Sequence, residues 1–115
     1  MKAILRHISI IVSSEASVAF YSRLGFKEIK RIFRDRDFVV LMEGNGMMLE
    51  LFVDPSHPNR ASKPENLGIR CFSLETDNLD SAIKELECDP IKTDWFGKRY
   101  CFTYDPDGLP VQLHE

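Results

Sequence analysis

Four side chains of the kinds that bind metal ions lie in short apolar segments of this 115-residue chain. They are an imidazole, a carboxylate, a thiol and a side-chain amide. Each of these groups can donate to a divalent ion, so together they predict a metal site. The alternative is that they lie on a solvated surface and share no chemistry. The four residues are His7, Glu50, Cys71 and Gln112.

The N-terminal half of the chain is predicted to form a βαβββ unit that carries the first two of these residues. Residues 3–12 are rich in isoleucine and valine, which is typical of a strand. A helix is expected next, with Ser13 or Ser14 as its N-cap and Gly25 in a left-handed conformation after its end. Residues 44–46 are a hairpin signal. The other expected features are a helical apolar stripe at Ala16, Ala19, Phe20 and Leu24 and strands at residues 26–33, 38–43 and 47–53.

The C-terminal half repeats this order after a proline-rich segment. Residues 54–66 favour a linker or a loop over a pocket. A strand at residues 67–76 should lead into a helix capped by Asp77 or Asn78. Residues 105–108 suit a type I turn. The remaining features are a helical stripe at Leu79, Ala82, Ile83 and Leu86 and strands at residues 90–95, 99–104 and 109–114.

Strand alternation places the four ligand-type residues on comparable faces of the two units. His7 and Glu50 share the less apolar face of the first unit, and Cys71 and Gln112 share that of the second. If the units pack as pseudo-twofold mates with their sheets curved toward each other, the four side chains converge in one cleft. A fully wet face is the alternative, and it is disfavoured because large apolar residues share the first unit's face. Those residues are Ile11, Met48 and Phe52.

The chain resembles the glyoxalase / bleomycin-resistance / extradiol-dioxygenase superfamily, also called vicinal oxygen chelate proteins. The resemblance lies in HISII, AFYSRLGF, MLELF, GIRCFSLETDNLDSAI and FTYDPDGLPVQLHE, and it is strongest to small bacterial glyoxalase I-like (lactoylglutathione lyase-like) proteins. It implies an α+β fold in which two βαβββ modules form a cup-shaped half-barrel of mixed and antiparallel strands with helices outside. It also implies a homodimer. One domain over residues 1–115 is expected, with modules at about 1–53 and 67–115 joined by the linker.

The resemblance further implies a divalent metal that chelates two neighbouring oxygens of a substrate. His7 and Glu50 match the family's first two ligands, whereas Cys71 replaces a histidine and Gln112 replaces a glutamate. A Cys71 thiolate would keep the formal charge of the family's ligand set and would favour zinc over magnesium or manganese. Zinc, nickel or cobalt is therefore the expected cofactor. Loss of two family ligands leaves a metal-free site as the alternative.

The implied function is a glyoxalase I-like lyase or isomerase acting on a small substrate with neighbouring oxygens, such as a thiol–aldehyde adduct. Gln112 cannot act as a base, so Glu50 is the remaining candidate to move the proton. This substitution predicts weak or no turnover of the glutathione adduct of methylglyoxal. The alternatives are a metal-free small-molecule-binding protein of the bleomycin-resistance type and a ferredoxin-like regulatory domain without a site.

Charge and composition exclude several other classes. The net charge of −3 argues against nucleic-acid binding, which needs a basic surface. No apolar run approaches the ~20 residues of a membrane span. Three cysteines without a CxxC pair indicate a reducing, cytoplasmic setting. The resemblance implies a small-molecule substrate or ligand as partner.

Several other residues allow two interpretations, a role at the site or an ordinary place on the solvated surface or in the core. The second interpretation is favoured. Cationic side chains could bind an anionic substrate group at the rim of the cup, and aromatic ones could line a pocket. One further histidine shares a face with Gln112 and could serve as a spare ligand, and another lies in the proline-rich segment. These residues are Arg60, Lys63, Arg70, Arg99, Trp95, Phe96, Tyr100, His114 and His57.

Overall fold

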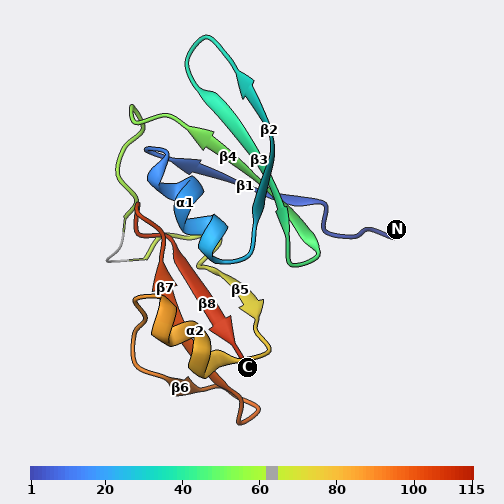
Figure 1. Cartoon of the computed structure of the whole chain (residues 1–115), viewed down its shortest axis with the longest axis vertical. Coiled ribbons are helices and arrows are strands. Elements are labelled where there is room, and N and C mark those ends of the chain that lie inside the picture. Colours follow the sequence, from blue (N-terminus) through green and yellow to red (C-terminus); the bar gives the residue numbers. More distant parts are fainter. Residues whose placement is uncertain (62–64) are drawn as a thin grey trace. The chain divides into compact units, whose positions relative to one another are not determined.

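The computed structural model describes residues 1–61 and 65–115 and divides the chain into two compact units, Met1–Asn59 and Arg60–Glu115. Figure 1 shows the N-terminal unit in blue to green and the C-terminal unit in yellow to red. Each unit has the predicted βαβββ order, so this part of the fold prediction is confirmed. The N-terminal unit contains β1 (His7–Val12), α1 (Ala16–Arg23), β2 (Lys27–Phe33), β3 (Phe38–Gly44) and β4 (Met47–Val53). The C-terminal unit contains β5 (Phe72–Glu75), α2 (Leu79–Glu85), β6 (Lys92–Thr93), β7 (Arg99–Tyr104) and β8 (Pro110–His114).

The N-terminal unit forms a four-stranded mixed sheet in the order β1-β4-β3-β2. β1 and β4 are parallel, and their register places Ser9 opposite Glu50. The other pairs are antiparallel. The β3–β4 hairpin closes through Asn45 and Gly46, whose φ angles of 53° and 74° match the two left-handed positions of a tight hairpin turn. This register brings the first and last strands of the unit side by side.

The C-terminal unit repeats this arrangement in a second four-stranded sheet, β5-β8-β7-β6. β5 and β8 are parallel and the other pairs are antiparallel. Ser73 lies opposite Gln112, as Ser9 lies opposite Glu50 in the first unit. The internal repeat therefore extends from the order of the elements to the pairing of individual residues.

One face of each sheet is buried beneath its helix, and the other face is more exposed, as alternation predicted. We call the second surface the open face of each unit. The buried face of the N-terminal sheet includes Ile10, Val12, Val40, Met42, Leu49, Leu51 and Val53. The buried face of the C-terminal sheet includes Leu74, Cys101, Val111 and Leu113.

The stripe predicted for the first helix is wrong. α1 buries Ser17, Val18 and Tyr21, while Ala16 and Ala19 are exposed. The reason is the Tyr21 ring, which packs edge-on against neighbouring aromatic rings and so gains more from burial than an alanine does. α2 follows its predicted stripe, with Leu79 buried. No helix in the described ranges is long and apolar enough to cross a membrane.

Several predicted boundaries also need correction. β1 begins at His7 rather than residue 3, and β6 is only Lys92–Thr93 rather than residues 90–95. β5 begins at Phe72 rather than residue 67, because Gly68 at φ +125° interrupts the extended chain. Glu15 stands at the N-cap position of α1, and the predicted Ser14 directly precedes it, where its hydroxyl accepts a hydrogen bond of 3.2 Å from the Ala16 backbone N–H.

The cap and turn residues predicted at other positions are confirmed. Asn78 caps α2 by accepting a hydrogen bond of 3.0 Å from the Ser81 backbone N–H. Gly25 follows α1 at φ +95°, as expected. In the turn at residues 105–108, the Gly108 backbone N–H donates to the Asp105 carbonyl. Residues 62–64 of the predicted linker lie outside the described residues.

Candidate functional site

A polar cluster lies on the open face of the N-terminal sheet, where β1 and β4 run side by side. His7 Nε2 lies 2.9 Å from Glu50 Oε1. The Ser9 hydroxyl donates to the same oxygen over 2.9 Å. His7 and Ser9 are two residues apart on β1, so alternation directs both toward the face that carries Glu50. The structure therefore brings together the two N-terminal residues that the sequence predicted for the site.

The cluster is accessible without being fully exposed. The side chains of His7 and Glu50 retain 32% and 26% of their accessible surface. Leu41 lies opposite Glu50 on the neighbouring strand β3, and Phe52 follows two residues later on β4. Ile11 lies opposite Phe52 on β1 and is exposed. The open face thus combines an imidazole–carboxylate pair with apolar side chains, as expected for a face that binds a small organic molecule.

Ser9 is a third member of this cluster, and the sequence analysis assigned it no role. Its hydroxyl fixes one oxygen of the Glu50 carboxylate that His7 also contacts. The signal was present in the alternation, because Ser9 lies two positions from His7. Its parallel pairing with Glu50 could not be predicted without the register.

The corresponding positions of the C-terminal unit carry different chemistry. Gln112 is half-buried on the open face, between Ser73 of β5 and Phe102 of β7 in register. Cys71 directly precedes β5 and is half-buried. Burial is the main cause that raises the pKa of the Cys71 thiol, and the Arg70 charge opposes it. The isolated chain therefore favours a protonated Cys71 rather than the thiolate that a metal requires.

His114, the histidine considered above as a spare ligand, has polar partners of its own. Its Nε2 lies 2.6 Å from Asp94 Oδ2, and its Nδ1 lies 2.8 Å from the Glu115 carbonyl oxygen. The Asp94 carboxylate and then the Glu115 carbonyl raise the pKa of His114, because both contacts favour a ring that donates from both nitrogens. The ring also stacks on Tyr100 at a centroid distance of 6.3 Å.

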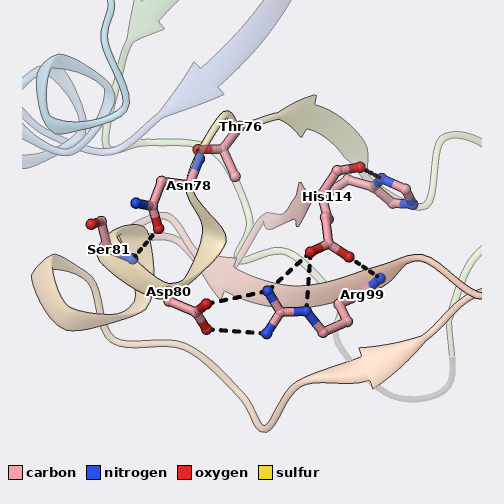
Figure 2. Close-up of polar contacts among 7 residues, drawn as sticks. Thr76, Asn78, Asp80, Ser81, Arg99 and His114 are labelled. Atoms are coloured by element: carbon pink, nitrogen blue, oxygen red, sulfur yellow. Dashed lines mark hydrogen bonds and ion pairs between the residues drawn. The ribbon is translucent and has the colours of Figure 1, made fainter.

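Two of the four cationic side chains considered for substrate binding, Arg70 and Arg99, are paired with carboxylates. Arg99 bridges the Asp80 carboxylate, at 3.1 Å, and the Glu115 side chain, at 3.0 Å. Figure 2 shows Arg99 reaching from β7 to Asp80 on α2. Arg70 pairs with Glu65 at 3.1 Å. Lys63 lies outside the described residues.

Two of the four predicted metal ligands are in contact with each other in the structure. Within residues 1–61 and 65–115, no group of three or more His, Cys, Asp and Glu side chains is gathered as a metal site. His7 and Glu50 form a two-donor cluster in the N-terminal unit. An imidazole nitrogen and a carboxylate oxygen fit zinc, nickel or cobalt, so this cluster fits part of the ligand set.

The chain is similar in sequence and in structure to known proteins. Residues 4–113 match the Glyoxalase/Bleomycin resistance protein/Dioxygenase superfamily. The uncharacterized protein YwkD of Bacillus subtilis (strain 168) is 39% identical over 96% of this chain and 95% of its own length. The crystal structure of the glyoxalase family protein from Enterococcus faecalis is 31% identical, with a TM-score of 0.85, and the match covers 99% of this chain and 98% of that chain.

Structures with more distant sequences share the fold alone. A lactoylglutathione lyase from Agrobacterium tumefaciens has a TM-score of 0.70 at 19% identity, covering 99% of this chain and 94% of that chain. The fosfomycin resistance protein FosX from Listeria monocytogenes has a TM-score of 0.75 at 18% identity, covering 99% and 93%. A bleomycin-binding protein complexed with bleomycin has a TM-score of 0.64 at 20% identity, covering 98% of each chain. One fold thus serves proteins with three different named functions.

Proposed function

Since this chain belongs to the Glyoxalase/Bleomycin resistance protein/Dioxygenase superfamily, we propose that it is a glyoxalase I-like lyase or isomerase that uses a divalent metal. Its substrate is a small molecule with neighbouring oxygens, such as a thiol–aldehyde adduct. The observation that carries the proposal is the contact of 2.9 Å between His7 Nε2 and Glu50 Oε1. An accessible imidazole–carboxylate pair on a partly apolar face supplies both ligand atoms and a base.

The proposed ligands are His7, Glu50, Cys71 and Gln112. The matched register of the two sheets supports this set, because Ser9–Glu50 in one unit corresponds to Ser73–Gln112 in the other. A bound metal would stabilise negative charge on two neighbouring substrate oxygens. The two softer or neutral donors favour zinc, nickel or cobalt over magnesium.

The chain's own residues are proposed to handle the proton. Glu50 takes it from the hydroxyl-bearing carbon beside the carbonyl group of the substrate and returns it to the carbonyl carbon. The hydroxyl proton passes to the neighbouring oxygen, so the substrate is isomerised with no net oxidation. The Ser9 hydroxyl orients the carboxylate for this transfer. Gln112 cannot share the task, since an amide is not a useful base. We therefore expect slow turnover of the glutathione adduct of methylglyoxal.

Binding of an ion at the proposed site is expected to be pH-dependent. The Cys71 thiol must lose its proton before it can donate to a metal, against a pKa that burial raises. Apparent metal affinity should therefore rise with pH.

Element analysis of the purified full chain, after incubation with zinc, nickel or cobalt and gel filtration, tests the proposal. We expect about one ion per chain. His7→Ala and Glu50→Ala should each lower the affinity at least ~100-fold, beyond the 10–100-fold typical of outer-sphere changes. His57→Ala and Glu43→Ala are matched controls, because both side chains belong to the same unit and are not proposed ligands. An equal loss in the controls, or no bound ion, would refute the proposal.

A metal-free binding protein is the second candidate function. The raised pKa of Cys71 and the apolar side chains beside Glu50 favour this alternative. It predicts that the protein treated with a chelator binds small apolar-aromatic molecules tightly. Isothermal titration with bleomycin as the probe, with and without zinc, distinguishes the two: affinity that does not depend on zinc and survives His7→Ala supports the binder.

We further propose that the protein acts in the cytoplasm as a homodimer with a small-molecule ligand. The basis is family membership, together with three cysteines that the structure leaves as free thiols. Sedimentation velocity at micromolar concentration tests the dimer, and a single monomeric species would contradict it. Cell fractionation tests the location.

A further inference from the structure

The first six residues lead away from β1, and we call Met1–Arg6 the N-terminal arm. Figure 1 shows it as the blue trace that ends at the N-terminus. Every residue of the arm is exposed, including the large apolar side chains of Ile4 and Leu5, at 94% and 69%. Within the described ranges, no residue forms a hydrogen bond or an ion pair with the arm. Its apolar side chains are therefore left without a packing surface.

The arm has the composition of a strand but no neighbouring strand to pair with. The sequence predicts a strand from residue 3, whereas β1 begins at His7. In register His7 lies opposite Met48, and β4 begins only one residue earlier, at Met47 after the hairpin turn. β4 thus has no residues left to pair with residues 3–5. A partner for this part of the chain has to come from another surface.

The corresponding segment of the C-terminal unit shows the same mismatch. A strand is predicted from residue 67, whereas β5 begins later. We call residues 67–70 the pre-β5 segment, and its apolar side chains Leu67 and Ile69 are 105% and 81% exposed. The matched registers make Ser73 the equivalent of Ser9, so Ile69 is the equivalent of Leu5. The repeat therefore leaves an exposed apolar segment before the first strand of each unit.

We propose that the N-terminal arm of one copy of this chain docks on the pre-β5 segment of a second copy, and that the second copy does the same in return. The inference rests on the homodimer proposed above and names its contact surface. Each copy carries both halves of the contact, so one twofold axis brings both pairs of segments together. Both exposed apolar segments are then removed from water, which is the main source of free energy for such an association.

The charges of the arm also favour a second copy as its partner. Lys2 and Arg6 are the only charged side chains of the arm, and both are cationic. The rest of the chain is therefore more acidic than the net charge of −3 for the whole. Glu65, directly before the pre-β5 segment, keeps 61% of its side-chain surface accessible. A cationic arm and an acidic body are complementary between two copies.

Docking would bring the second copy to the edge of the cluster formed by His7 and Glu50. A strand continued from β1 through the arm places Leu5 on the same face as His7, because the two residues are two positions apart. The pre-β5 segment of the second copy would then cover the arm beside His7. The dimer would thus shield one edge of the cluster from solvent.

Sedimentation velocity of the full chain over a range of concentrations measures the dissociation constant of the dimer. Leu5→Lys and Ile69→Lys should each raise it at least ~10-fold, because each substitution replaces an apolar side chain at two symmetry-related contacts. Phe33→Lys is the matched control. Phe33 is 76% exposed at the end of β2, outside both segments, so its substitution should leave the dissociation constant unchanged.

Hydrogen exchange of the full chain gives a second measurement. The backbone amides of residues 3–6 should become protected as the protein concentration rises through the dissociation constant. Equal protection at every concentration would show a contact within one chain and would overturn the inference. A dimer that Leu5→Lys and Ile69→Lys leave intact would overturn the inference alone. A single monomeric species would overturn the proposed homodimer as well, while ion binding by His7 and Glu50 is measured separately by element analysis.

Discussion

The two units of this protein share strand order and register, yet their open faces carry different polar groups. In the N-terminal unit, His7 and Ser9 both contact the Glu50 carboxylate. In the C-terminal unit the register-matched pair is Ser73 and Gln112. Its imidazole–carboxylate contact lies elsewhere, between His114 and Asp94 at the start of the β6–β7 turn.

This difference shows that the repeated fold determines where side chains lie on the open face. The residue type at each position then determines what chemistry is possible there. The backbone pairs of β1–β4 and β5–β8 are equivalent because both are parallel and both bury alternate apolar residues. The open face is under no such packing demand, so polar residues there can change without loss of the fold. The first unit carries an imidazole and a carboxylate in contact, whereas the second carries a thiol and an amide at the corresponding positions.

The largest expected effect comes from making the second unit resemble the first in chemistry. The double variant Cys71→His, Gln112→Glu supplies an imidazole and a second carboxylate. We expect turnover of the glutathione adduct of methylglyoxal to rise ~100-fold or more in the presence of nickel or zinc, since a positioned base contributes roughly 10²–10⁴. Steady-state assays of purified protein measure it. Asn59→Asp adds a like charge at an exposed position, and a similar gain there would contradict the expectation.

The next largest effect is expected on the stability of the N-terminal unit, where the backbone of Gly44 lies close to that of Gly25. A Cβ at Gly44 would lie 2.2 Å from the Gly25 carbonyl oxygen and 2.9 Å from the Phe26 Cα. Gly44→Ala should therefore lower the free energy of unfolding by about 3 kcal/mol or more, since the backbone must shift. Gly108→Ala in the C-terminal unit meets open space at φ +86° and should cost about 1–2 kcal/mol. Urea unfolding compares the two, and equal costs would show that the approach is not tight.

A smaller effect on stability is expected from the helix caps, which differ between the two units. Asn78 accepts a hydrogen bond from the Ser81 backbone N–H, as Figure 2 shows, whereas Glu15 caps α1 without a side-chain hydrogen bond. Asn78→Ala should destabilise by about 1 kcal/mol, and Asn78→Asp should restore most of the loss. Thermal unfolding followed by circular dichroism measures both variants. A loss that aspartate does not recover would point away from capping.

The smallest expected effect is a pH dependence confined to the C-terminal unit. The pKa of His114 is raised above its ordinary value of 6.5, first by the Asp94 carboxylate and then by the Glu115 carbonyl. The stabilisation is therefore complete below pH 6.5 and is lost as the pH rises through the folded-state pKa. Urea unfolding at a series of pH values, followed by Trp95 fluorescence, should show this decline. His114→Gln should flatten it, whereas His57→Gln in the other unit should leave it unchanged.

Much of the fold was predictable because its signals are local. The hairpin at residues 44–46, the Asn78 cap and the alternating buried residues of β1, β4 and β8 all follow from neighbouring residue types. The stripe of α1 was mispredicted, because the large Tyr21 ring rather than the alanines decides which side is buried. The start expected for β5 at residue 67 was also wrong, because the positive φ of Gly68 interrupts the extended backbone.

The candidate site was predictable only in part. Alternation placed His7 and Glu50 on one side of their strands, and the structure brings their side chains into contact. The role of Ser9 depended on the β1–β4 register, which local residue types do not specify. The assignment of Cys71 and Gln112 to the same ion stays a prediction.

The sequence by itself determined the order of the strands and helices, which strand faces are apolar and to which superfamily the chain belongs. Those properties depend on residue type and on periods of a few positions. Only the tertiary structure decided which polar atoms meet: Ser9 with Glu50, and His114 with Asp94. These contacts join residues 41 and 20 positions apart. Pairing across such separations is set by sheet register and packing rather than by any local pattern.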